Sequence, residues 1–251
     1  MYAVTNSHVV NHGATVVRLN TKDGFRAIHD IHASVWTHHP DGDDLAVCPL
    51  PLTDAHRYQA LDAKAFLITR EFIAEHQVGV GDDVYMVGRF INHEGRQQNA
   101  PSVRFGNIAR MNDEPILSES GKWQESFLIE GRSVPGYSGS PVFLWLYLGN
   151  PRPGQTVLRA TWFHRVLGVD WCHLNQEWTV RDRNGAEVAD DDGRTPGYHV
   201  RGNTGMMGVI PAWKLWDLLD APDVVEERKN ADDEYAKRQR ESGVSLDSET
   251  T

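Results

Sequence analysis

The segment from Pro135 to Pro141, Pro-Gly-Tyr-Ser-Gly-Ser-Pro, most constrains how this chain can fold. It lies between a polar loop, Glu130 to Val134, and an apolar run, Val142 to Leu148. The glycines beside Ser138 allow positive φ angles, and two backbone N–H groups can then point at one developing oxyanion. The segment is therefore either a nucleophilic serine before a buried strand or a tight turn, because Gly, Ser and Pro are also common turn residues.

A nucleophilic serine needs a base, and the base needs a carboxylate that orients it. Both candidates lie upstream of the serine segment. Met1 to Val4 carries a small apolar strand toward His8, and Asp44 stands just before the apolar run Leu45 to Leu50. The order along the chain is therefore His, Asp, Ser. An α/β-hydrolase esterase would have the order Ser, acid, His, so that fold does not fit.

Three segments match one known family in this order: Thr5 to His8, Asp44 to Ala46 and Gly136 to Pro141. The chain resembles the chymotrypsin-like serine proteases, whose sites read Thr-x-x-His, Asp-(Leu/Ile)-Ala and Gly-x-Ser-Gly-(Gly/Ser)-Pro. The resemblance is closest to the bacterial trypsin-like and high-temperature-requirement branches, and it covers most of Met1 to Leu219. It implies that His8 is the general base, that Asp44 orients it and that Ser138 is the nucleophile. Asp41 and Asp43 compete with Asp44, but Leu45-Ala46-Val47 after Asp44 fits the family register.

The same resemblance suggests an oxyanion hole and a substrate pocket. The backbone N–H groups of Gly136 and Ser138 would form the oxyanion hole. In this family the residue six positions before the nucleophile often lies at the base of the pocket, which here is Arg132, with walls from Val169, Asp170 and Trp171. Arg132 would favour cleavage after Glu or Asp. Alternatively, Arg132 faces solvent, or Asp170 neutralises it.

Tyr137 stands where zymogen-type members of the family carry an acidic residue. That residue pairs with a newly cut N-terminal amine in those proteins. Activation by this route is therefore not expected for this chain.

The predicted fold is all-β, with two antiparallel six-stranded Greek-key barrels and a C-terminal helix. Residues 1–95 would form the first barrel, with His8 and Asp44 at its rim. Residues 96–222 would form the second barrel and the helix, and residues 223–251 a charged, partly disordered tail. The family normally has two more strands before the histidine strand. We therefore expect an incomplete first barrel or a truncated N-terminus.

Short runs rich in β-branched residues, separated by Gly, Asn, Asp and Pro turns, are typical of strands. A hairpin loop at Asn20 to Gly24, one or two helical turns at Thr69 to His76, a long exposed loop at Asn184 to Asn203 and a helix from Pro211 are also predicted. The predicted strands are Tyr2 to Thr5, Thr15 to Leu19, Ala33 to Thr37, Leu45 to Leu50, Val80 to Arg89, Val103 to Ala109, Ser126 to Ile129, Val142 to Leu148, Val157 to Phe163, Val166 to Cys172 and Met206 to Ile210.

Composition excludes several other classes of protein. With 251 residues and 40% hydrophobic content, the chain can form a real core. Its formal net charge of −10 disfavours binding to nucleic acid or to anionic membranes. No apolar run reaches the roughly 18 residues of a membrane helix. No signal peptide is visible, and with only Cys48 and Cys172 there is no disulfide framework, which favours a cytoplasmic location.

A zinc site is the remaining alternative chemistry. His29, His32, His38 and His39 lie near Asp41 and Asp43, but their spacing matches no compact zinc motif. These histidines are therefore interpreted as part of a polar, solvated loop, and no metal or other cofactor is predicted.

The sequence thus predicts a serine endopeptidase that acts on polypeptides through a covalent acyl-enzyme, without a cofactor. The alternative is a non-catalytic binding module of the same fold, which the short N-terminus favours. The sequence does not indicate an oligomeric state.

Overall fold

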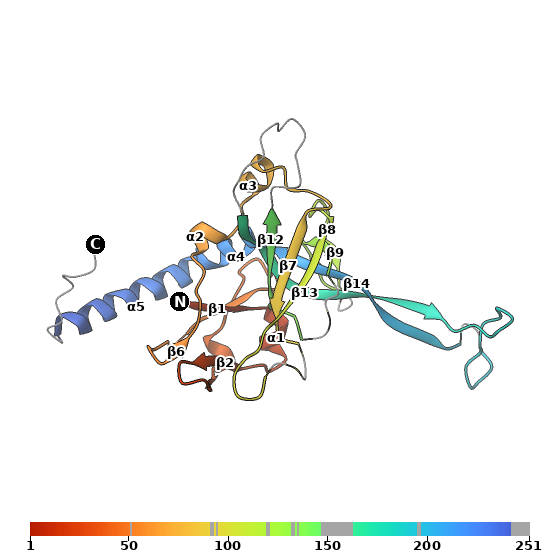
Figure 1. Ribbon diagram of the computed structural model, residues 1–251, viewed down its shortest axis with the longest axis horizontal. Coiled ribbons are helices and arrows are strands. Elements are labelled where there is room, and N and C mark those ends of the chain that lie inside the picture. Colours follow the sequence, from red (N-terminus) through yellow and green to blue (C-terminus); the bar gives the residue numbers. More distant parts are fainter. Residues whose placement is uncertain are drawn as a thin grey trace.

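Six antiparallel strands between Asp83 and Pro211 close into a barrel (Figure 1). The computed structural model describes residues 1–241 apart from 51, 91–92, 94, 119–120, 132–133, 135, 147–162 and 195–196. Around the barrel the order is β11, β14, β13, β12, β7 and β8, and β8 pairs again with β11. The strands are β7 (Asp83–Gly88), β8 (Ser102–Arg110), β11 (Phe127–Glu130), β12 (Pro141–Leu146), β13 (Phe163–Thr179) and β14 (His199–Pro211).

Alternate side chains of the barrel strands point inward, where they can form a common core. In β7 and β12 every second residue is buried, as in Val84 with Met86 and Val142 with Leu144. These side chains meet Ile129 of β11 and Met207 of β14 in one continuous core. One of the two predicted six-stranded barrels is therefore confirmed, although its strand β7 lies before residue 96.

The first half of the chain forms two separate three-stranded sheets instead of a second closed barrel in the described residues. One sheet has the order β1 (Tyr2–Thr5), β5 (Ala46–Pro49), β4 (Thr37–His38). The other has the order β3 (Arg26–Asp30), β2 (Val16–Thr21), β6 (His56–Arg57). The two-barrel prediction thus holds for one barrel only, because β4 and β6 are two residues long and give too few pairings to close the first. The Greek-key path stays a prediction.

The predicted strand from Ala33 to Thr37 is wrong. Ala33–Val35 forms the 3₁₀ helix η1, because the side chain of His32 accepts the Ser34 N–H and caps a helical turn. Only Thr37 of that range lies in a strand. In contrast, the predicted hairpin loop after β2 is present, since Thr21 N–H donates to the carbonyl of Phe25.

Residues 95 and 96, the expected boundary between the two halves, fall between β7 and β8. Both of these strands belong to the closed barrel, because β7 pairs with β8 and with β12. The part of the chain that builds the barrel therefore begins before the predicted boundary.

Short helices connect the strands. The helix predicted near Thr69 is confirmed as α3 (Arg70–Glu75), and the Thr69 side chain accepts the Phe72 N–H as its cap. The other short helices are α1 (Ser7–Asn11) and α2 (Ala63–Phe66), and a small two-stranded sheet is formed by β9 (Ile116–Leu117) and β10 (Trp123–Gln124).

Two helices end the described chain. The predicted C-terminal helix is α4 (Ala212–Leu219), which follows Pro211 and buries Trp213, Leu215 and Leu218. Helix α5 (Pro222–Glu241) carries the charged segment away from the body (Figure 1). No helix in the described ranges is long and apolar enough to span a membrane.

Strands β13 and β14 extend far beyond the barrel as a two-stranded arm (Figure 1). The prediction of a loop from Asn184 to Asn203 is therefore wrong for its last residues, which belong to β14. The strand predicted at Val157 to Phe163 falls outside the described residues except for Phe163, the first residue of β13.

Candidate active site

His8 and Asp44 form a directly bonded pair. His8 lies in α1, one turn after β1 ends, and Asp44 stands just before β5. The Nδ1 atom of His8 is 2.6 Å from Oδ2 of Asp44, and the backbone N–H of His8 donates to Oδ1 over 2.9 Å. Both carboxylate oxygens are therefore used by one residue. This arrangement favours the tautomer with the proton on Nδ1 and leaves Nε2 as an acceptor.

The backbone of Asp44 is held on both sides by buried amide side chains. Asn6 donates from Nδ2 to the Asp44 carbonyl, and Gln124 accepts the Asp44 N–H at Oε1, each over 2.9 Å. Both amide side chains are fully shielded from solvent. The sequence reasoning missed Asn6 and Gln124, although Asn6 lies inside the Thr5-to-His8 segment.

The neighbouring Asp43 has different partners. Its Oδ2 lies 3.1 Å from Nζ of Lys214 in α4, and its Oδ1 accepts from Nε2 of Gln124. Burial lowers the pKa of Lys214, but the bonds and charges of Asp43 and Glu125 outweigh burial and raise it. Asp43 therefore anchors α4, whereas Asp44 is the aspartate that bonds to His8.

The pKa of Asp44 is lower than the usual value of 3.8. Burial raises the pKa of this carboxyl, but the hydrogen bonds and the charge of His8 together lower it more. A carboxyl with a depressed folded-state pKa contributes stability above its unfolded pKa, and this contribution is lost as the pH falls through the folded pKa.

We therefore expect the stability advantage of the wild type over Asp44→Asn to shrink as the pH falls from about 5 into the range below the ordinary Asp pKa. Urea unfolding of both proteins across this range measures the difference. A difference in unfolding free energy that stays constant or grows on acidification would contradict the assigned interaction.

The Ser138 loop packs against the strand that leads to His8. Gly136 and Gly139 have φ angles of 97° and 86°, which favour glycine. A Cβ atom on Gly139 would lie 2.6 Å from Oγ1 of Thr5, so the loop and the end of β1 are in direct contact. Three predicted catalytic residues from distant segments are thus brought to one region. The structure shows no hydrogen bond between the His8 ring and the Ser138 hydroxyl, and such bonds often tighten only when substrate binds.

The backbone of this loop leaves two N–H groups without a backbone acceptor in the described part of the chain. The N–H groups of Tyr137, Gly139 and Ser140 donate to the carbonyls of Val134, Asp170 and Tyr137, respectively. The N–H groups of Gly136 and Ser138, the predicted oxyanion-hole donors, make no such bond there. The loop geometry is therefore compatible with an anion at this position.

Tyr137 anchors the loop in the barrel. Its side chain is fully buried, and its hydroxyl lies 2.6 Å from Oγ of Ser102 and 2.9 Å from Nε of Arg104. The guanidinium of Arg104 also stacks 4.8 Å from the centre of the Tyr137 ring. Contacts to β8 thus fix the residue before Ser138. That residue is a tyrosine, so it has no carboxylate that could pair with a newly cut N-terminal amine.

Gly88 makes room for this anchor. A Cβ atom there would lie 2.4 Å from Oγ of Ser140 and 2.6 Å from Cδ1 of Tyr137. We expect Gly88→Ala to displace the loop, lowering the unfolding free energy by about 1–3 kcal/mol and the rate of peptide cleavage by at least about tenfold. Thermal unfolding and a peptide cleavage assay measure the two effects.

Gly79→Ala is the matched control. The nearest atom to its added Cβ is 3.9 Å away, so this variant should behave much more like the wild type. Equal losses in both variants would show that the contact at Gly88 has no special role.

The predicted pocket residues of β13 are all buried. Val169 and Trp171 pack with Leu45 and Ile210 between the two halves, and Nε1 of Trp171 donates to Oγ of Ser126 over 2.9 Å. The backbone of Asp170 bonds to the Ser138 loop on both its N–H and its carbonyl. These residues support the loop, and their contact with substrate stays a prediction. Arg132 lies outside the described residues.

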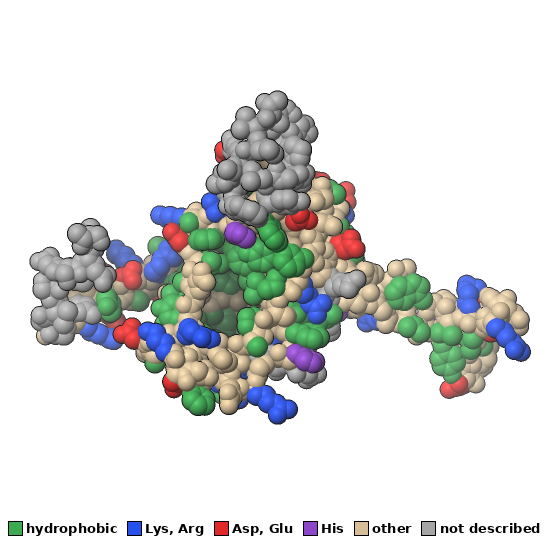
Figure 2. All heavy atoms as spheres, in the orientation of Figure 1, with side chains coloured by type: hydrophobic (Ala, Val, Ile, Leu, Met, Phe, Trp, Pro, Cys, Tyr) green, Lys and Arg blue, Asp and Glu red, His purple; other side chains and the backbone are tan. Residues whose placement is uncertain are grey.

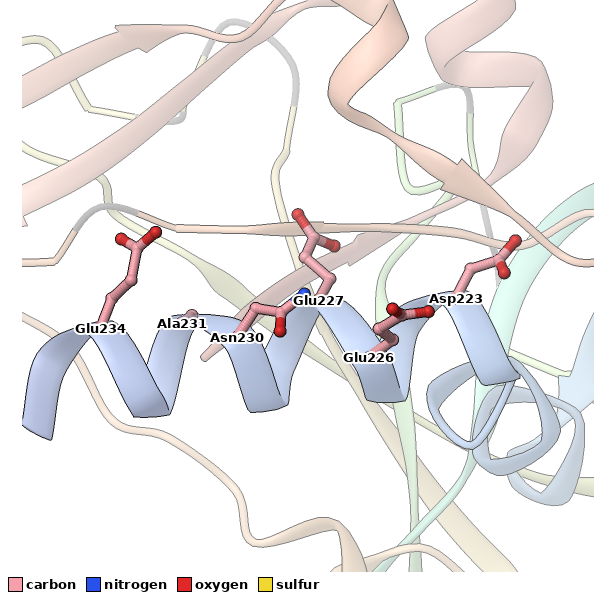
Figure 3. A pocket seen from close by; sticks show the side chains of 6 residues that line it. All are labelled: Asp223, Glu226, Glu227, Asn230, Ala231 and Glu234. Carbon is pink, nitrogen blue, oxygen red and sulfur yellow. The ribbon is translucent and has the colours of Figure 1, made fainter.

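Three other features were considered as candidate sites: metal-binding clusters, the cysteine Cys48 and a hollow along α5. No three His, Cys, Asp or Glu side chains in the described ranges are grouped to hold a metal ion. Burial raises the pKa of the Cys48 thiol to about 11, so this cysteine is unreactive at neutral pH. A hollow along α5 is lined by Asp223, Glu226, Glu227, Asn230, Ala231 and Glu234 (Figure 3). None of the predicted catalytic residues belongs to it.

A family model described as a trypsin-like peptidase domain matches residues 2–144, a range that contains His8, Asp44 and Ser138. The solved structure titled "Crystal structure of Deg5" is similar with a TM-score of 0.42 and 19% sequence identity, over 68% of this chain and 68% of that chain. No curated protein matches the sequence.

Proposed function

The chain belongs to the family of trypsin-like peptidase domains, and on this premise we propose that it is a serine endopeptidase with Ser138, His8 and Asp44 as its catalytic residues. The observation that carries the proposal is the His8–Asp44 pair. Both oxygens of Asp44 bond to His8, one at the ring Nδ1 and one at the backbone N–H. This leaves the Nε2 atom as the base for a serine whose loop contacts Thr5.

The first half of the reaction forms an acyl-enzyme. As Oγ of Ser138 attacks the peptide carbonyl, Nε2 of His8 takes the serine proton, and the buried Asp44 stabilises the imidazolium. The N–H groups of Gly136 and Ser138 donate to the oxyanion of the tetrahedral intermediate. The intermediate then collapses, the C–N bond breaks, and His8 returns the proton to the leaving amine.

The second half repeats these steps with water. His8 takes a proton from the water that attacks the ester carbonyl, the bond to Oγ breaks, and the proton returns to Ser138. The two products are a carboxylic acid and a free Ser138. The preference for Glu or Asp before the cleaved bond, suggested by Arg132, stays a separate prediction.

Labelling with a fluorophosphonate probe tests the proposed nucleophile. The wild type should bind the probe covalently, and Ser138→Ala should not. Ser140→Ala is the control and should still be labelled. Ser140 is buried two positions after Ser138, so its hydroxyl should not react with the probe. An unlabelled, folded wild type would refute the proposal and leave a non-catalytic binding module as the function.

A further inference from the structure

Gln124 joins the part of the chain that carries His8 and Asp44 to the part that carries Ser138. It lies in β10 and is 1% exposed. Its Oε1 atom accepts the N–H of Asp44 over 2.9 Å, and its Nε2 atom donates to Oδ1 of Asp43. Both polar atoms of the side chain are therefore used, one as an acceptor and the other as a donor. A neutral amide supplies these two roles at once, whereas an ionised carboxylate only accepts.

A second set of hydrogen bonds leads from Gln124 toward the loop of the proposed nucleophile. The Oγ atom of Ser126 donates to the Gln124 carbonyl over 3.2 Å and accepts from Nε1 of Trp171 over 2.9 Å. The residue before Trp171 is Asp170, whose carbonyl accepts the N–H of Gly139 over 2.8 Å. Gly139 directly follows the proposed nucleophile. A path of hydrogen bonds and one peptide unit thus connects Gln124 to this loop.

Every side chain along this path is buried. Asp44, Gln124, Ser126, Asp170 and Trp171 are each at most 4% exposed. A buried polar group that loses its partner cannot bond to water instead, so breaking such a bond costs more than breaking the same bond at the surface. The path therefore holds the backbone of Asp44 in a fixed relation to the nucleophile loop.

We propose that Gln124 is a positioning residue, which sets the placement of His8 against Ser138 through Asp44. This inference rests on the proposed function. Both carboxylate oxygens of Asp44 bond to His8, so a shift of the Asp44 backbone also moves the imidazole. A displacement of about 1 Å in a catalytic arrangement can lower the rate by about 100-fold. Because Gln124 is shielded from solvent, it acts through Asp44 and not by contact with substrate.

Gln124→Met keeps the length of the side chain and removes both of its hydrogen-bonding groups. We expect kcat for peptide cleavage to fall by at least about tenfold and KM to stay within about twofold of the wild type. Gln176→Met is the matched control. Gln176 is exposed on the arm of β13 and β14, which projects away from the body (Figure 2), so this variant should keep the wild-type kcat.

Gln124→Glu gives a test that a purely structural role would not pass. Burial and the neighbouring Asp43 carboxylate should raise the pKa of the introduced carboxyl. When protonated, this carboxyl donates to Asp43 and accepts from Asp44, as the amide does. When ionised, it has no donor and is repelled by Asp43. The kcat of Gln124→Glu, divided by that of the wild type at the same pH, should therefore be highest in acid and fall as the pH rises.

Two further variants test the partners of Gln124. Adding Asp43→Asn to Gln124→Glu should abolish the fall with pH, because the new amide can donate to the ionised carboxylate. Ser126→Ala breaks the path on its other side. If both bonds act through one path, the loss of kcat in the double variant of Gln124→Met and Ser126→Ala should be smaller than the product of the two single losses.

A folded Gln124→Met protein with the wild-type kcat would overturn the inference. A Gln124→Glu ratio that is the same at every pH, or losses that multiply in the double variant, would also overturn it. If Gln124→Met does not fold, the pH series decides, with thermal unfolding measured at each pH. A wild type that neither cleaves peptides nor binds the fluorophosphonate probe refutes the proposed function and this inference together. An active wild type with unaffected Gln124 variants refutes the positioning role alone.

Discussion

Ser138→Ala and His8→Ala are each expected to lower kcat for peptide hydrolysis by at least about 10⁴-fold, and the double variant should be little worse than either. Removing Ser138 removes the oxygen that forms the acyl-enzyme. Removing His8 removes the Nε2 atom that accepts the serine proton, together with the Nδ1 atom that bonds to Asp44. Members of a catalytic triad act as a unit, so their effects do not add. Steady-state kinetics with a peptide substrate gives the three values.

Folding must be measured alongside. Ser138 is only partly buried and makes no side-chain bond to His8 in the structure, so Ser138→Ala should keep the thermal unfolding temperature close to that of the wild type. A folded Ser138→Ala or His8→Ala protein that retains most of the activity would refute the assignment of that residue.

Asp44→Asn is expected to lower kcat by about 10⁴-fold, because an amide at this position favours the wrong tautomer of His8. Asp43→Asn should change kcat only slightly. Asp43 is bound to Lys214 and Gln124, and the structure gives it no contact with His8. The second variant loses part of the anchoring of α4 instead, which thermal unfolding would detect.

The paired comparison separates the two carboxylates under identical conditions. A large loss of kcat in Asp43→Asn with little effect in Asp44→Asn would move the orienting role to Asp43. Equal losses would indicate that Gln124, which bonds to both residues, transmits either change.

Sequence patterns predicted the strands and helices that are determined by residues close together in the chain. The alternation in β7 and β12 identified barrel strands, and the Thr69 cap identified α3, because each signal lies within one element. Whether the described strands of the first half close into a barrel depends on which strands pair, and such pairings are not visible in a short segment. The side chain of His32 caps η1, so residues 33–35 form a helical turn where a strand was predicted.

The supports of the candidate site show the same limit. Asn6 and Gln124 bond to the backbone of Asp44 from 38 and 80 positions away, and no periodicity marks such contacts. The proposed catalytic residues could be named from the sequence, because His8, Asp44 and Ser138 each lie in a recognisable segment, and their roles stay a prediction. The arm was missed since Gly, Asp and Arg dominate the connection, although Trp178 and Val180 already alternate with polar residues.

Trapping of the acyl-enzyme shows directly whether Ser138 is the nucleophile. The wild type is mixed with an activated ester of a peptide, quenched in acid after a fraction of one turnover, and digested for mass spectrometry. The proposed mechanism predicts a mass increase equal to the acyl group on the fragment that contains Ser138, with a much weaker signal in His8→Ala. Turnover of the ester by a wild type that carries no acyl group on Ser138, or carries it on another residue, would contradict the mechanism.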